Sequence, residues 1–75
     1  MLEQMSTLMV YPAMGGGWRV RRHLARRAMR VFRTFPPALA YGRGLAKKRG
    51  VDLCVFNSDG GIVRTEDYAP AAQRA

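Results

Sequence analysis

The sequence predicts an α+β domain: a single antiparallel or mixed sheet of four to five strands with one helix packed on one face, in the order β-β-(β)-α-β-β. Three observations predict it. Segments of alternating apolar and polar residues occupy both halves of the chain, one stretch between them has helical periodicity, and glycine-rich turns separate strands. With 75 residues the chain forms one domain. We expect residues 1–5 to be a flexible N-terminus, residues 6–68 the domain and residues 69–75 a disordered tail.

The first two expected strands are joined by a glycine turn. The segment TLMVYP alternates, with Leu8 and Val10 on one side and Thr7, Met9 and Tyr11 on the other. The run GGG that follows allows the positive φ angles of a hairpin turn. The next segment, WRVRRH, has one largely apolar face and one basic face. These two faces are Trp18, Val20 and Arg22, and Arg19, Arg21 and His23.

A third short strand is expected in the segment AMRVF, after a wide turn over residues 24–27. Met29 and Val31 fall on one side of it, and Arg30 and Phe32 fall on the other. We expect Met29 and Val31 to contribute to the core.

The stretch FPPALAYGRGLAKKRG predicts the helix. Thr34 is the expected N-cap, and prolines in the first turn lose no helical hydrogen bond because the amides there are free. We expect Gly42 to allow a close approach of the helix to the sheet, whereas the sequence does not explain Gly44. Basic residues fill the last turn, and Gly50 is the expected C′ residue. The stripe expected to face the sheet is Ala38, Tyr41, Gly42 and Leu45, flanked by Leu39 and Ala46.

Two more strands follow the helix. The segment VDLCVF alternates, the segment NSDGG forms a turn, and the segment IVRT is the last strand. The two faces of VDLCVF are Val51, Leu53 and Val55, and Asp52, Cys54 and Phe56. A single helix covers one sheet face, yet both sides of the strands carry apolar residues. We therefore expect the other face to be a binding surface or the interface of a homodimer.

The charge distribution predicts an anionic partner. The net charge is +8, and eleven of the thirteen basic residues lie between Glu3 and Asp52, where no acidic residue occurs. Seven of them are arginines within residues 15–33. Without compensating acids these side chains repel one another in a free monomer, and arginine suits bidentate phosphate or carboxylate binding. The alternative interpretation is a solvated charged face in a chain rich in arginine and alanine.

The expected binding surface is built from the strands and the loop between them. We expect Arg19, Arg21 and Arg30 to point to one side of the sheet, with Arg26 and Arg27 on the connecting loop, as a single patch. The full set of expected contacts with an anionic partner is Arg19, Arg21, Arg22, Arg26, Arg27, Arg30, Arg33, Lys47 and Lys48.

The residues argue against catalysis. The candidates are His23, Cys54 and a few carboxylates, and no pairing motif or phosphate-binding glycine loop accompanies them. Cys54 in a strand is expected to be a small buried hydrophobe. One cysteine allows neither an internal disulfide nor a clustered zinc site, so no metal and no cofactor are expected. No apolar run is long enough to cross a bilayer, so we expect no membrane partner and a cytoplasmic protein.

Several motifs resemble a small uncharacterised family of prokaryotic and phage domains. They are GGGWRV, RAMRVF, a helix ending GLAKKRG, then LCVFNSDGGI and EDY, and the likeness covers Val10 to Tyr68. Such domains of unknown function combine a glycine-tryptophan hairpin, an alanine-rich helix closing on lysine and glycine, and a strand pair joined by an Asp-Gly turn. The resemblance implies the order β-β-α-β-β and no assigned activity. This chain departs from the pattern in its arginine density and at Phe35, Pro36 and Pro37, where such helices open with polar residues.

Two function classes follow. The first is a small, non-enzymatic protein that binds DNA, RNA or a nucleoprotein complex through an Arg-rich sheet and loop surface. The alternative is a phage-encoded inhibitor of a bacterial defence system, of the anti-CRISPR type, which binds the surface of an effector protein and blocks its access to DNA. A role at a membrane surface is weaker, because the basic residues lie on expected strands rather than along an amphipathic helix.

Overall fold

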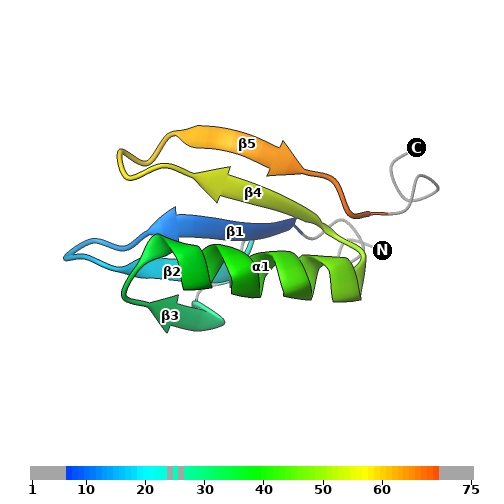
Figure 1. Ribbon diagram of the computed structural model, residues 1–75, viewed down its shortest axis with the longest axis horizontal. Coiled ribbons are helices and arrows are strands. Elements are labelled where there is room, and N and C mark those ends of the chain that lie inside the picture. The colour runs from blue at the N-terminus through cyan, green and yellow to red at the C-terminus, as the bar shows by residue number, and fades with distance from the viewer. Residues whose placement is uncertain (1–6, 24, 26, 70–75) are drawn as a thin grey trace.

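The computed structural model describes residues 7–23, 25 and 27–69, which form a five-stranded mixed sheet with one helix on one face (Figure 1). The element order β-β-β-α-β-β confirms the predicted fold class. Of the ends expected to be flexible, residues 1–5 and 69–75, all but Ala69 lie outside the described residues, and the Ala69 N–H donates to Asp52 Oδ1 at 3.2 Å. The elements are β1 (Thr7–Pro12), β2 (Trp18–Arg22), β3 (Arg30–Phe32), α1 (Phe35–Arg49), β4 (Asp52–Phe56) and β5 (Ile62–Glu66).

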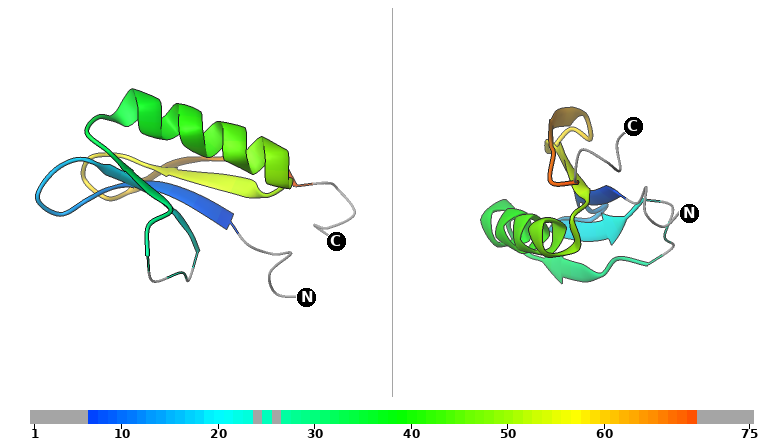
Figure 2. Two further views of the ribbon diagram at one scale, coloured as in Figure 1. Left: turned by 90° about the horizontal axis from the view of Figure 1, so that it is seen from below. Right: turned by 90° about the vertical axis from the view of Figure 1, so that its right-hand side faces the viewer.

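The sheet has the strand order β3-β2-β1-β4-β5. β1 is central: it pairs antiparallel with β2 and parallel with β4. The pairs β2–β3 and β4–β5 are antiparallel. The helix follows β3 and returns the chain to the middle of the sheet, as a parallel neighbour requires. β3 and β5 are therefore the two edges, and α1 lies over the strands between them and over β3 (Figure 2).

The core lies between α1 and the central strands. The register aligns Val10 with Val20 on one side and with Val55 on the other, so the alternation expected in β1, β2 and β4 is confirmed. Small residues of α1 face this layer, and a Cβ added to Gly42 would lie 2.8 Å from Val10 Cγ2. The close approach predicted at Gly42 is thus confirmed. The buried hydrophobic residues are Leu8, Val10, Val20, Ala38, Ala46, Leu53 and Val55.

The ends of α1 follow the predicted signals. Thr34 is in an extended conformation ahead of the first turn and makes no side-chain cap hydrogen bond, and the prolines occupy the first turn. Gly50 adopts the left-handed conformation, with φ 67° and ψ 44°, and its N–H donates to the carbonyl oxygen of Ala46. The basic last turn lies where the helix dipole favours cations.

The core contribution expected of Met29 is confirmed, because Met29 packs against the core, but the one expected of Val31 in β3 is wrong. Arg19 pairs with Val31, which therefore lies on the face away from α1 and is 60% exposed. Phe32 pairs with Trp18 and packs under the helix, where its ring centroid lies 5.5 Å from that of Tyr41. The different sizes and polarities of the Phe32 and Arg30 side chains explain the register of this edge strand. This register partly buries the phenyl ring of Phe32, while Arg30, with its long side chain, stays exposed.

Candidate functional site

The strand register divides the arginines between the two faces of the sheet. Arg19 and Arg21 alternate with Val20, so they lie on the face away from α1, which we call the open face. Arg30 pairs with Val20, and paired residues share a face, so Arg30 lies on the helix side. The prediction that Arg19, Arg21 and Arg30 form one patch is therefore wrong. The predicted alternation within each strand is correct, but the predicted face of Arg30 relative to Arg19 and Arg21 is wrong.

Arg21 is held by contacts within the protein. Its guanidinium lies 5.2 Å from the ring centroid of Tyr11, and its Nη1 donates a 2.5 Å hydrogen bond to the carbonyl oxygen of Ala25. The side chain is half-buried, whereas Arg19 on the same face is exposed. Arg21 therefore stabilises the end of β2 and has less freedom to bind a partner than Arg19.

Three other arginines converge on a surface groove of about 620 Å³. Arg22 comes from the end of β2 on the helix side, Arg27 from the β2–β3 connection, and Arg49 from the last turn of α1. All three side chains are exposed. We call this site the basic groove, and its lining residues are Arg22, Ala25, Arg27, Ala28, Met29 and Arg49.

The chemistry of the basic groove suits an anion. A guanidinium is always charged at physiological pH and presents its N–H donors as a planar fork that fits phosphate or carboxylate. The ion pairs found among residues 7–23, 25 and 27–69 join Glu66 to Arg43 and Arg64 and leave the groove arginines out. Among the described residues that line the groove, none is acidic. The other described lining residues are Ala25, Ala28 and Met29, so among the described side chains the polar contacts come from the arginines.

The remaining predicted contact residues are spread over other surfaces. The guanidinium of Arg30 lies 5.5 Å from the ring centroid of Phe32 and 5.4 Å from that of Tyr41, which places it at the β3 edge. Arg33 is exposed and lines a separate groove with the glycine turn. Lys48 is exposed on the last turn of α1. The remaining two are Lys47, whose ammonium lies over the ring of Tyr68, and Arg26, which lies outside the described residues.

Arg49 belongs to the site but was missing from the predicted set. The signal was present, because Arg49 ends the run of basic residues before Gly50. Its inclusion depends on the end of α1 lying beside the β2–β3 connection, and a local pattern carries no information about that. Of the predicted residues whose positions are described, the basic groove brings together Arg22 and Arg27.

A cluster of ion pairs and hydrogen bonds around Glu66, which we call the Glu66 cluster, lies near the opposite edge of the sheet. The Glu66 carboxylate accepts from Arg43 Nε at 2.8 Å and Arg43 Nη2 at 2.6 Å, from Arg64 Nε at 2.9 Å and from the Tyr68 hydroxyl at 2.7 Å. The Arg43 hydrogen bonds are the main reason why the pKa of Glu66 falls from its usual 4.5 to about 2. The same carboxylate raises the pKa of Tyr68, whose hydroxyl donates to it. Glu66 therefore stays ionised and joins α1 to β5.

Comparison with known families identifies the sequence family of this chain. The sequence model of a family described as "Uncharacterized protein conserved in bacteria (DUF2188)" matches residues 9–68. The chain belongs to this family. The match runs from β1 to Tyr68, so the region shared with the DUF2188 family contains both the basic groove and the Glu66 cluster. No curated protein and no solved structure gave a match.

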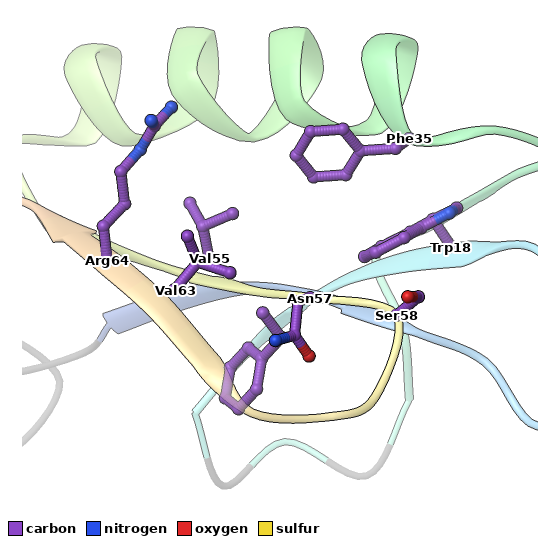
Figure 3. A pocket seen from close by; sticks show the side chains of 8 residues that line it. Trp18, Phe35, Val55, Asn57, Ser58, Val63 and Arg64 are labelled. Carbon is purple, nitrogen blue, oxygen red and sulfur yellow. The ribbon is translucent and has the colours of Figure 1, made fainter.

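A second cavity, of about 370 Å³, lies at the start of α1 within the DUF2188 region (Figure 3). Trp18 and Phe35 form one end of it, with ring centroids 4.8 Å apart in an edge-to-face arrangement. Trp18 is half-buried and packs against the core, as expected for the apolar face of β2. The rest of the lining is Val55, Phe56, Asn57, Ser58, Val63 and Arg64.

The polar residues considered for chemistry lie apart from the basic groove. Cys54 is half-buried in β4, where it aligns with Met9 and Thr65, and His23 is exposed just after β2. In the part of the chain that the structure describes, no three His, Cys, Asp or Glu side chains are placed to hold a metal ion. Within the same part, no helix is long and apolar enough to span a membrane.

Proposed function

We propose that this protein binds nucleic acid, without catalysing a reaction on it, through contacts between the basic groove and backbone phosphates. One observation carries the proposal: three exposed arginines from three different segments converge on a groove, and none of the described residues that line it is acidic. Charge-assisted hydrogen bonds from such groups to phosphate are among the stronger polar contacts that a protein surface makes. The net charge of +8 adds a long-range attraction for polyanions.

The lining of the groove favours recognition of phosphates over recognition of bases. Its other residues are Ala25, Ala28 and Met29, which offer no side-chain hydrogen bonds to base edges. Trp18, the side chain best suited to stack on a base, packs against Phe35 instead. We therefore expect weak sequence preference and an affinity that falls steeply with salt concentration.

The chemistry of the groove arginines favours binding over catalysis. A guanidinium keeps its proton at physiological pH, and no other acid or base side chain is among the described residues that line the groove. Positive charge fixed on three segments positions an anion but supplies neither a base nor a nucleophile. The groove is thus chemically suited to holding a polyanion in place.

The test measures the binding of fluorescent single-stranded DNA, double-stranded DNA and RNA by anisotropy at low and physiological salt. The groove variant carries Arg22→Gln and Arg49→Gln. The control carries Arg19→Gln and Lys47→Gln, which removes the same charge from exposed side chains that do not line the groove. We expect the groove variant to bind about a hundredfold more weakly or worse, since it loses two charged hydrogen bonds that contribute roughly 1.5–3 kcal/mol each. The control should lose much less.

Two results would contradict the proposal. Equal losses in the two double variants would show that net charge acts without a defined site. Absence of binding to all three nucleic acids at low salt would rule out the function itself. The anti-CRISPR alternative would then be the hypothesis to test, by capturing purified CRISPR effector subunits with the protein.

A further inference from the structure

The two edges of the sheet differ in length and covering. β3 has three residues, and the side chain of Arg30 reaches across the rings of Phe32 and Tyr41 beside it. β5 has five residues and stands clear of the helix, which reaches it through the Arg43–Glu66 ion pair (Figures 1 and 2). Natural edges are protected by short strands, lysine, proline or bulges. β5 contains neither lysine nor proline, and its irregularity is a bulge at Val63, which lies between the residues paired with Phe56 and Val55 near the start of the strand.

β5 also exposes apolar side chains. Ile62 is 62% exposed and Val63 is 55% exposed, and Thr65 is exposed as well. In contrast, Met9 and Phe56, which lie on the open face, are half-buried. Among the described residues, β5 thus combines exposed large hydrophobic side chains with a strand edge that pairs with β4 alone. This combination favours the addition of another strand.

We propose that β5 pairs antiparallel with β5 of a second copy of this chain, with the two-fold axis at Thr65. This register places Arg64 opposite Glu66 of the partner subunit, and the symmetry repeats the contact. Opposite charges in directly opposed positions stabilise a strand pair, and like charges destabilise it. An axis at Arg64 would oppose two arginines. An axis at Val63 would draw Gly60, a turn residue with φ of 87°, into the ladder.

The charge distribution permits this association despite the net charge of +8. Residues 52–69 hold four of the five acidic residues and a single arginine, so the β4–β5 half of the sheet is its less basic side. The basic groove lies near the β2–β3 edge. In a ten-stranded sheet the outer strands are about 43 Å apart, at about 4.8 Å per strand, whereas the Debye length at physiological salt is about 8 Å. Repulsion between the two grooves is therefore largely screened.

The first test is the mass in solution, measured by sedimentation equilibrium from about 1 to about 100 µM, a range that covers micromolar dissociation constants. It does not depend on nucleic-acid binding, so its outcome is separate from that of the proposed function. We expect the wild type to reach twice its monomer mass of 8.4 kDa. Thr65→Lys places two ammonium groups at the axis and should weaken dimerisation at least tenfold. Thr65→Gln, a neutral side chain at the same exposed position, should retain the dimer.

The second test fixes the register by disulfide formation in a Cys54→Ala background, because Cys54 aligns with Thr65 in the β4–β5 pair and would compete. Residues opposed at the axis have Cα atoms about 4.5–5.5 Å apart, within the range of a disulfide. Thr65→Cys should therefore cross-link two copies. Val63→Cys should not cross-link two copies, because this register places the two Val63 Cα atoms about 14 Å apart, too far for a disulfide.

Three outcomes would overturn the inference. A wild type that stays monomeric throughout the concentration range would contradict it, and so would a Thr65→Lys variant that dimerises as well as the wild type. Cross-linking through Val63→Cys in place of Thr65→Cys would refute the register. Circular dichroism of each variant separates loss of the dimer from loss of the fold.

Discussion

Two glycines of α1 give a matched test of how the helix packs on the sheet. A Cβ at Gly42 would lie 2.8 Å from Val10 Cγ2 and 3.3 Å from Leu53 Cδ1, whereas a Cβ at Gly44 would meet nothing within 4 Å. Alanine is favoured over glycine inside a helix by about 1 kcal/mol. Overpacking a rigid core costs about 1–3 kcal/mol, and Val10 is fully buried and β-branched, so it has little room to move.

The two substitutions should therefore have different effects. Gly44→Ala should stabilise the protein by about 1 kcal/mol, because it gains helix propensity without a clash. Gly42→Ala should leave the stability unchanged or reduce it by up to about 2 kcal/mol, since the clash offsets the same gain. Urea unfolding followed by circular dichroism measures both free energies. Equal stabilisation by the two variants would refute the close approach at Gly42.

The remaining predictions concern the ion pairs of Glu66 and the glycine turn between β1 and β2. Because the pKa of Glu66 lies below its unfolded value, its contribution to stability is present above about pH 4.5 and is lost as the pH falls toward 2. Glu66→Gln should cost about 1–2 kcal/mol at pH 7 and flatten the pH dependence of unfolding in that window; an unchanged pH profile would contradict this. Gly17 has φ of 83°, and a Cβ there would lie 2.8 Å from the carbonyl oxygen of Phe32. Gly17→Ala should therefore reduce the free energy of unfolding by about 1–3 kcal/mol and lower the melting temperature. The loss should exceed that of Gly16→Ala, where a Cβ meets nothing within 4 Å.

Local patterns predicted the elements of this fold because the relevant physics is local. The alternation in β1, β2 and β4 identified the buried side of each strand, and Gly50 and the prolines of the first turn bounded α1. The need for Gly42 also followed from its place on the stripe that faces the sheet. Each of these inferences uses residues within a few positions of one another.

The arrangement of the elements depends on contacts between distant segments. Alternation shows that Arg30 and Phe32 share one side of β3, but the pairing of Trp18 with Phe32 decides which side is buried. Because of that pairing, Arg30 lies on the helix side of the sheet, whereas Arg19 and Arg21 lie on the open face. The basic groove depends likewise on the end of α1 meeting the β2–β3 connection, which brings Arg49 to Arg22. Charge counting predicted a basic surface and could not place it.

The salt dependence of binding tests the central claim most directly. Each phosphate contact lowers the slope of log K against log salt by about 0.9 on duplex DNA and by about 0.7 on a single strand. If Arg22 and Arg49 each contact a phosphate, the groove variant should have a slope shallower by about 1.8 or 1.4, respectively. The control variant with Arg19→Gln and Lys47→Gln should keep the wild-type slope. A groove variant with the wild-type slope would contradict the assignment of nucleic-acid binding to the basic groove.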